Sequence, residues 1–247
     1  MADQRDLMRR EAGALAELAA LQRDPAFYGW GVPRGDGRLV MVVPGLFGND
    51  LYLGPLRSWL GRLGYTPVTS SLPLNAGCPN RLRGQVENAL AQRRQWRTGP
   101  LALIGHSRGG MLCWALASRL QDEVSHLILL GSPAGAVVTM MRQEGDVVPA
   151  NVATASVATA GTRALKLLDP DCTVPACGCD YVQDLRRDLS PSTKVLSIAS
   201  RDDGIVASGA TRIAGAENVE VGGTHGGLVY NRAVYPHIAR FLAAGRT

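Results

Sequence analysis

The stretch LALIGHSRGGMLCWALASRL, residues 101–120, constrains the fold of this chain more than any other. Its apolar run at residues 101–104 predicts a buried strand, and the apolar residues that follow Gly110 recur at helical spacing. Ser107 lies between them, in Gly-His-Ser-Arg-Gly. A serine on a sharp strand-to-helix bend needs glycines two positions before and after it, because the bend leaves no room for side chains there. The stretch therefore predicts a strand, a tight turn and a helix, with the Ser107 hydroxyl above a sheet.

Two explanations fit this turn. Small residues also serve to pack a helix against a strand, so the Gly-x-Ser-x-Gly pattern has a structural interpretation as well as a functional one. The predicted strand and helix on either side favour the functional one. The free N–H groups and the dipole at a helix N-terminus stabilise negative charge that develops during acyl transfer. Ser107 is therefore a candidate nucleophile.

The rest of the chain alternates strands with helices, which predicts βαβ units, a mostly parallel sheet of about six strands and helices on both faces. A chain of 247 residues suits a single domain of this three-layer α/β class. Strands are expected at residues 38–43, 66–71, 101–104, 125–130, 194–200 and 218–221, and helices at 50–63, 81–97, 111–120, 181–189, 207–214 and from the last glycine loop to 242.

Two segments depart from the alternation. Residues 134–192 are irregular and rich in Ala, Thr and Val, which favours an inserted lid over the site, or a plain surface excursion. Residues 1–37 comprise an N-terminal helix and a Gly- and Pro-rich connection. The helix carries one apolar stripe that we expect to pack on the body of the protein, or else on a partner: Leu7, Ala14, Leu15, Leu18 and Leu21.

Position along the predicted strands selects a histidine to act with Ser107, because reactive groups gather at the carboxyl ends of parallel strands. The sequence has four histidines. His126 begins its strand, His237 lies inside the terminal helix, and His106 points away from the serine beside it. His225 follows the end of a strand in a Gly-rich loop, where it is placed to act as general base.

A carboxylate is expected to hold the imidazole of His225. Asp202 and Asp203 both follow the strand at 194–200. Adjacent side chains in a turn point apart, so one of the two is expected to aim inward. Asp203 is the preferred residue because Gly204 permits a sharp turn after it, while Asp202 then faces solvent.

Two backbone N–H groups are expected to form an oxyanion hole. Arg108, directly after the candidate nucleophile, supplies the first. Leu46, in the turn PGLFG after the strand at 38–43, supplies the second, with Phe47 as the adjacent possibility. Phe47 is also a candidate substrate contact. The turn has a simpler interpretation as an ordinary strand-to-helix connection.

The order Ser107, Asp203, His225, together with the GHSRG turn and a glycine loop after the preceding strand, resembles the α/β-hydrolase superfamily, especially its bacterial lipase and esterase branch. The resemblance extends over about residues 38–242, and the chain begins near what is the family's third strand. Pro44 is a departure, because the family usually has histidine before the glycine of this loop. The resemblance implies an enzyme that hydrolyses a carboxylic ester through an acyl-enzyme.

Apolar residues in PGLFG and in residues 134–157 favour an aliphatic, lipid-like or other small-molecule ester as the substrate. An acyltransferase with the same triad is the alternative if water is excluded, and a binding protein with an inert site is the non-enzymatic one. No cofactor and no metal are expected.

The net charge of +5 comes almost wholly from scattered arginines, so a solvated basic face is favoured over nucleic-acid binding. The charged N-terminal residues do not resemble a signal peptide, and no apolar run is long enough to cross a bilayer, so a cytoplasmic protein is expected by default.

The five cysteines leave several possibilities open. Cys113, on the helix after Ser107, is expected to be a small buried residue. Cys172, Cys177 and Cys179 crowd one short segment, which favours a local disulfide or unpaired thiols over zinc, because a second ligand pair is lacking. A disulfide conflicts with the cytoplasmic prediction, since reducing compartments keep thiols free.

Overall fold

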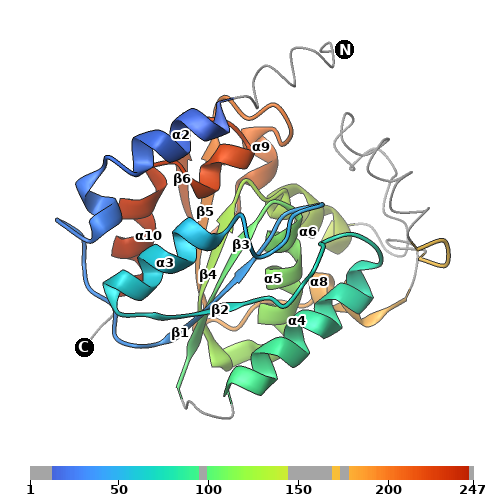
Figure 1. The fold of residues 1–247 in the computed structure, drawn as a ribbon. Helices are drawn as coiled ribbons and strands as arrows, with labels where there is room; N and C mark the ends of the chain where they lie inside the picture. The colour runs from blue at the N-terminus through green and yellow to red at the C-terminus, as the bar shows by residue number, and fades with distance from the viewer. Residues whose placement is uncertain (1–12, 95–98, 144–168, 173–177, 245–247) are drawn as a thin grey trace.

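A six-stranded parallel sheet forms the centre of the protein (Figure 1). The computed structural model describes residues 13–94, 99–143, 169–172 and 178–244. The strand order is β2-β1-β3-β4-β5-β6, and every neighbouring pair runs parallel. The predicted α/β fold class is confirmed. The strands are β1 (Leu39–Val43), β2 (Thr66–Thr69), β3 (Leu101–His106), β4 (Val124–Leu130), β5 (Lys194–Ser200) and β6 (Glu217–Val221).

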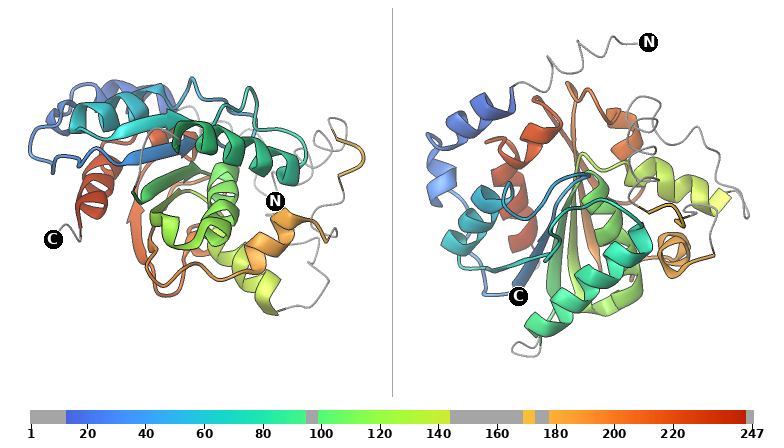
Figure 2. Two further views of the ribbon diagram at one scale, coloured as in Figure 1. Left: turned by 90° about the horizontal axis from the view of Figure 1, so that it is seen from below. Right: turned by 45° about the vertical axis from the view of Figure 1, so that its right-hand side comes forward.

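Helices cover both faces of the sheet, as Figures 1 and 2 show. On β1, Leu39, Met41 and Val43 point into one core and Val40 and Val42 into the other, because successive side chains of a strand alternate between faces. The first core is closed by α4 (Pro79–Arg94), α5 (Arg108–Leu120), α6 (Ala134–Gln143) and α8 (Asp180–Arg186), and the second by α2 (Ala14–Leu21), α3 (Gly54–Leu63) and α10 (Val234–Ala243).

Short helical turns complete the described chain. They are η1 (Pro25–Tyr28), η2 (Gln121–Glu123), α9 (Ser208–Thr211) and η4 (Gly226–Val229). Helix α3 begins four residues later than predicted, because the side chains before it form other bonds. Asn49 Oδ1 accepts the N–H of Leu51 at 2.9 Å, and Asp50 Oδ1 accepts the N–H of Ser70 at 3.1 Å.

The N-terminal helix does not bury the single apolar stripe that the sequence predicts. Leu21 is fully buried, but Leu15 is 79% exposed, and Leu7 lies outside the described residues. Glu17 and Leu21, four residues apart, share one face of the helix. Leu15 stands about 200° around the helix from Glu17, given 3.6 residues per turn. The inward face of α2 therefore carries a carboxylate as well as a leucine.

Both ends of the segment predicted as a lid contain regular helices that contribute side chains to the hydrophobic core. Residues 134–143 form α6 directly after β4, with Ala134 and Val138 buried. Helix α8 packs against α5 and buries Tyr181, Val182 and Leu185. The expectation that irregular chain begins at residue 134 is therefore wrong for α6, whereas α8 lies where the sequence predicts a helix at 181–189. For residues 144–168 and 173–177, the lid prediction lies outside the described residues.

The described cysteines differ in state. Cys113 is buried as predicted, and its burial raises the pKa of the thiol. Cys179 is disulfide-bonded, whereas Cys177 lies outside the described residues. In the part of the chain that the structure describes, no helix has both the length and the apolar character needed to cross a membrane.

Candidate active site

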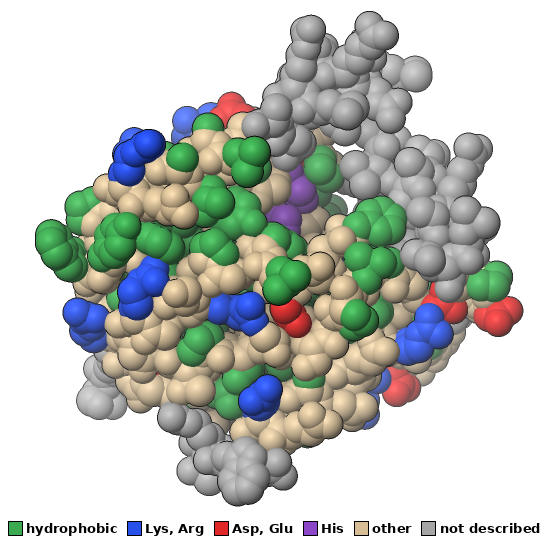
Figure 3. All heavy atoms as spheres, in the orientation of Figure 1, with side chains coloured by type: hydrophobic (Ala, Val, Ile, Leu, Met, Phe, Trp, Pro, Cys, Tyr) green, Lys and Arg blue, Asp and Glu red, His purple; other side chains and the backbone are tan. Residues whose placement is uncertain are grey.

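The strand order reverses at β1, which has β2 on one side and β3 on the other. In open parallel sheets, a crevice forms at such a switch point, outside the carboxyl ends of the strands. The turn that contains Gly45 and Leu46 follows β1, and Ser107 follows β3. In Figure 3, histidine atoms are visible in a hollow of the surface that hydrophobic side chains border.

Ser107 sits in a strained backbone conformation between β3 and α5. Its φ of 52° and ψ of −123° lie in a region that residues other than glycine rarely adopt, at a cost on the order of 1–3 kcal/mol. The surroundings enforce it: the Ser107 N–H donates to Leu130 O at 2.7 Å, and Ser107 O accepts from the Gly110 N–H at 2.9 Å. A Cβ on Gly105 would overlap the backbone of Gly110, and one on Gly109 that of β1 and Pro44.

Strain alone does not mark a site. Gln121, at the far end of α5, has nearly the same dihedrals as Ser107, a φ of 50° and a ψ of −124°. Its side-chain amide donates to Ser118 O in the last turn of α5 and, at 3.1 Å, to Asp188 O. What separates Ser107 from Gln121 is its position at the carboxyl edge of the sheet and the groups gathered around it.

Asp203 and His225 form a buried hydrogen bond at this edge. Asp203 Oδ2 accepts from His225 Nδ1 at 2.7 Å, and the two side chains are 1% and 6% exposed. The other oxygen, Oδ1, accepts the N–H groups of Ile205 and Val206 at 2.7 Å each. Because a carboxylate can only accept, His225 Nδ1 is the donor of this hydrogen bond.

His225 and Ser107 both lie near the end of β4. The Ser107 N–H binds Leu130 O, and the next residue, Gly131, lies against the His225 ring, where a Cβ would stand 3.2 Å from Nδ1. Ser107 Oγ makes no hydrogen bond to any described residue. Serine and imidazole thus share one corner of the site without being bonded to each other, and catalytic hydrogen bonds are often long before substrate binds.

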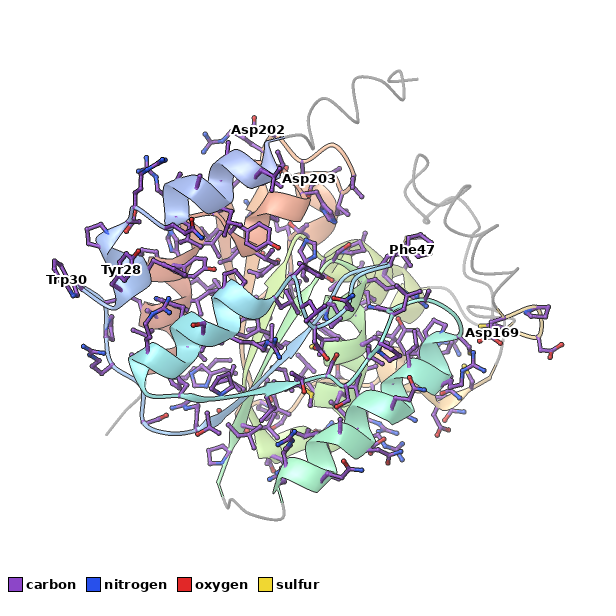
Figure 4. All side chains as sticks on the ribbon, viewed as in Figure 1. Tyr28, Trp30, Phe47, Asp169, Asp202 and Asp203 are labelled. Atoms are coloured by element: carbon purple, nitrogen blue, oxygen red, sulfur yellow. The ribbon has the colours of Figure 1, made fainter. Side chains whose placement is uncertain are left out.

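Asp202 takes a different role from Asp203. It is exposed, and its Oδ2 accepts the N–H of Gly223 at 3.0 Å rather than reaching the imidazole. Figure 4 shows both aspartates on the loop after β5, with Phe47 on the loop after β1. Asp202 thereby contacts the backbone of the loop that carries His225.

Two N–H groups beside Ser107 are uncommitted. Among the described residues, neither the Leu46 N–H nor the Arg108 N–H has a hydrogen-bond acceptor. The Phe47 N–H, by contrast, donates to Asn75 O at 3.0 Å. The turn approaches the serine closely, because a Cβ on Gly45 would lie 3.2 Å from Ser107 Cβ. Leu46 and Arg108 therefore leave donors available where Phe47 does not.

Tyr52 and Asn75 hold this turn, and neither was identified from the sequence. The Gly45 N–H donates to Tyr52 Oη at 2.6 Å, and Asn75 Nδ2 donates to Pro44 O at 2.6 Å. The N–H of Asn75 also donates to Gly48 O at 2.7 Å. Asn75 is fully buried. Pro44 has no side chain that could hold this turn as a histidine would. The bonds of Tyr52 and Asn75 hold it instead.

His106 joins the turn to the loop of His225. Tyr52 Oη accepts from Gly45, so its own proton goes to His106 Nδ1 at 2.9 Å. His106 Nε2 then donates to the His225 carbonyl at 2.9 Å. Burial, with a smaller contribution from the nearby His225, lowers the pKa of His106 to about 3, so the ring is neutral. His106 is thus a structural link, consistent with the expectation that it is not the base.

The Arg108 side chain holds the loop on the other side of the turn. Nη2 donates to Gly77 O at 2.6 Å and Nη1 to Asn75 O at 3.3 Å. Burial lowers the pKa of this guanidinium. Within the described ranges, no three His, Cys, Asp or Glu side chains are grouped so that they could hold a metal ion.

The remaining histidines lie away from this corner. His126, near the start of β4, has Nδ1 2.7 Å from Arg38 Nη1 at the amino edge of the sheet. His237 lies in α10. Both positions follow the sequence prediction.

Comparison with known proteins agrees with the fold. A family model described as the alpha/beta hydrolase fold matches residues 82–155. No curated protein matches the sequence. A lipase from Bacillus licheniformis in its mature form is 16% identical with a TM-score of 0.58, covering 86% of this chain and 94% of the lipase.

Two further solved structures are similar. A metagenomic carboxyl esterase is 13% identical with a TM-score of 0.58, covering 95% of this chain and 91% of the esterase. The enol-lactonase from Burkholderia xenovorans is 18% identical with a TM-score of 0.51, covering 85% of this chain and 92% of the lactonase. At such identities the likeness concerns the fold. The parallel sheet, the family match and these likenesses together show that the chain has an α/β-hydrolase-type fold.

Proposed function

We propose that this protein hydrolyses carboxylic esters through an acyl-enzyme on Ser107. The observation that carries the proposal is the buried Asp203–His225 hydrogen bond of 2.7 Å, at the corner where a strained serine begins α5. The two uncommitted N–H groups of Leu46 and Arg108 lie on either side of that serine. Nucleophile, base, orienting carboxylate and oxyanion donors are then all present.

The first half of the reaction forms the acyl-enzyme. Ser107 Oγ attacks the ester carbonyl carbon while His225 Nε2 takes the hydroxyl proton. The carbonyl oxygen becomes an oxyanion that accepts from the Leu46 and Arg108 N–H groups. Asp203 balances the positive charge of the imidazolium. The C–O bond to the alcohol then breaks, and His225 returns the proton to the leaving oxygen.

The second half uses water in place of the serine. His225 removes a proton from the water as its oxygen attacks the acyl carbon. The tetrahedral intermediate collapses, the bond to Ser107 Oγ breaks, and the proton passes from His225 to that oxygen. The carboxylic acid is released and the enzyme is restored.

Exposed apolar side chains near the turn support an aliphatic acyl group as substrate. Phe47 is 47% exposed, Leu51 80% and Leu74 42%. They lie on two loops that the Phe47–Asn75 and Asn75–Gly48 backbone hydrogen bonds join. An acyl chain laid across these side chains would remove apolar surface from water. Phe47, next to the oxyanion turn, is the proposed first contact.

The test compares wild type with Ser107→Ala. Both proteins are treated with a fluorophosphonate probe and assayed on p-nitrophenyl esters of short and long acyl chains and on a lactone. The wild type is expected to be labelled and to turn over esters, with a higher kcat/KM for longer chains. Ser107→Ala is expected to lose labelling and at least 10³-fold of the turnover, on the order seen when a triad serine is removed. Unlabelled, inactive wild type, or equal turnover by both proteins, would sink the proposal.

A further inference from the structure

The loop that carries His225 is rich in glycine. Its sequence is Gly222-Gly223-Thr224-His225-Gly226-Gly227, so glycine pairs stand on both sides of Thr224 and His225. Glycine has the greatest backbone freedom of any residue, so the bonds that this loop makes determine where its histidine lies. Local bonds form the turn η4 after His225, and bonds from other elements fix the loop before it.

Glu17 of the N-terminal helix α2 supplies such a bond. Its Oε1 accepts the Thr224 N–H at 2.7 Å, and its Oε2 accepts the Thr224 hydroxyl at 3.3 Å. The Thr224 hydroxyl in turn accepts the Gly227 N–H at 2.9 Å. A helix that lies outside the α/β alternation thus places a carboxylate against the residue directly before His225.

The loop is shaped around this carboxylate. A Cβ on Gly223 would stand 2.7 Å from Glu17 Oε1, and a Cβ on Gly227 would overlap Oε2. Gly223 also has a φ of 119°, which side chains rarely permit. The two glycines therefore leave the space that the Glu17 carboxylate occupies, on both sides of His225.

Three carboxylates act on three successive residues of the loop. Asp202 accepts the Gly223 N–H at 3.0 Å, Glu17 the Thr224 N–H at 2.7 Å, and Asp203 the His225 ring at 2.7 Å. Hydrogen bonds to carboxylates are stronger than those between neutral groups. Asp202 and Asp203 come from the loop after β5, whereas Glu17 approaches from the opposite end of the chain.

We propose that Glu17 is a positioning residue for the reaction: it fixes the main chain at Thr224 so that the imidazole of His225 keeps its direction toward Ser107. The inference rests on the proposed function, in which His225 is the base. Glu17 touches no reacting atom. Its effect acts through the loop and falls on kcat, because a base held at the wrong angle slows proton transfer without changing how substrate binds.

The test uses four variants of the full chain. Glu17→Ala removes both acceptors, and we expect kcat to fall about 10- to 100-fold with KM changed less than twofold. Glu17→Gln keeps an oxygen that can accept the Thr224 N–H, and it is expected to recover most of the lost kcat. Leu15→Ala, on the exposed face of the same helix, is expected to behave as wild type. Leu21→Ala weakens the packing of α2 and leaves the carboxylate in place.

Leu21→Ala separates positioning from simple docking of the helix. If it lowers kcat as much as Glu17→Ala at an equal loss of Tm, or if Glu17→Gln is as slow as Glu17→Ala, the inference is wrong. A second readout is the downfield proton resonance of the His225 Nδ1–H, which is expected to broaden in Glu17→Ala and persist in Leu15→Ala.

His225→Ala distinguishes this inference from the proposed function. If wild type hydrolyses no ester, or if His225→Ala is as active as wild type, the proposed function itself fails. If His225→Ala is inactive while Glu17→Ala keeps the wild-type kcat and the sharp resonance, the proposed function stands and Glu17 merely anchors the helix.

Discussion

Two buried histidines stand at opposite edges of the sheet, and the charged group bonded to Nδ1 differs between them. His225 and His126 are each 4% exposed. At the carboxyl edge, His225 Nδ1 lies 2.7 Å from Asp203, and at the amino edge His126 Nδ1 lies 2.7 Å from Arg38. A carboxylate accepts the ring proton and balances the charge that the imidazole gains in proton transfer. A guanidinium donates to the ring nitrogen and opposes that charge.

The consequence is seen at His126. Burial, and then the positive charge of Arg38, lower its pKa to about 4, so it stays neutral at ordinary pH. The amino edge even has a cavity of about 250 Å³, lined by Asp36, Arg38 and Arg94 among others. It holds neither a strained serine nor a carboxylate-bound histidine among the described residues. Burial and a nearby cavity therefore do not identify a catalytic histidine. The charge beside the ring and the edge of the sheet on which it lies distinguish His225 from His126.

The largest expected effect comes from removing the charge that distinguishes His225. Asp203→Asn keeps the shape but can present an N–H to Nδ1, which favours the wrong tautomer, and kcat is expected to fall by about 10⁴. Asp202→Asn, matched in chemistry, still offers an oxygen to Gly223 and is expected to lose less than tenfold. Steady-state kinetics on one p-nitrophenyl ester measures both. A larger loss in Asp202→Asn would reverse the assignment of the acid.

Tyr52→Phe tests the link between the turn after β1, which contains Gly45 and Leu46, and the His225 loop. Without the hydroxyl, the Gly45 N–H loses its acceptor and His106 Nδ1 loses its donor. We expect kcat to fall about tenfold while KM stays near its wild-type value, because the loss concerns the transition state. Tyr28→Phe is the matched control, since its hydroxyl donates to Gln22 O at an exposed position. Equal kcat in wild type and Tyr52→Phe would show that the turn holds without this link.

The smallest effect concerns stability at the amino edge. The pKa of His126 is about 4 in the folded protein against an ordinary value of 6.5, so the unfolded chain binds more protons between these values. The stabilisation that neutral His126 allows is complete above about pH 6.5 and is lost as pH falls toward about 4.

In His126→Gln, the slope of the unfolding free energy against pH in that window is expected to fall by the equivalent of up to one bound proton. The kcat is expected to stay unchanged. Urea unfolding at stepped pH measures the slope. His106, with its pKa near 3, keeps a remainder of the slope in the variant. An unchanged slope would contradict the lowered pKa of His126, and a large loss of activity would contradict the contrast between the two edges.

The sequence predicted what depends on order along the chain. Strands and helices follow from hydrophobic period, and parallel pairing brings the ends of β3, β5 and β6 to one edge. Ser107, Asp203 and His225 could therefore be selected by position, and the structure brings Asp203 and His225 into contact. The prediction that Leu15 packs on the body was wrong, because the spacing of apolar residues alone does not say which face of a surface helix meets the body.

Residues that act through tertiary approach could not be found in this way. Tyr52 meets His106 across 54 positions, and Glu17 meets Thr224 across 207. Such pairs depend on how loops and helices approach each other, which no local pattern encodes. A signal did exist for Glu17: it is a charge on an Ala- and Leu-rich helix, on the face that also carries buried Leu21.

The strand order also divides the candidate site between two parts of the sheet. Strands β1 to β4 are contiguous in both sequence and sheet, and the turn at Ser107 follows β3 within this block. Asp203 and His225 follow β5 and β6, which add at the edge in turn. A chain paired only through β4 carries a serine without a base. If Ser107 is the nucleophile, acylation by a reactive ester is therefore expected to require the β5–β6 pair.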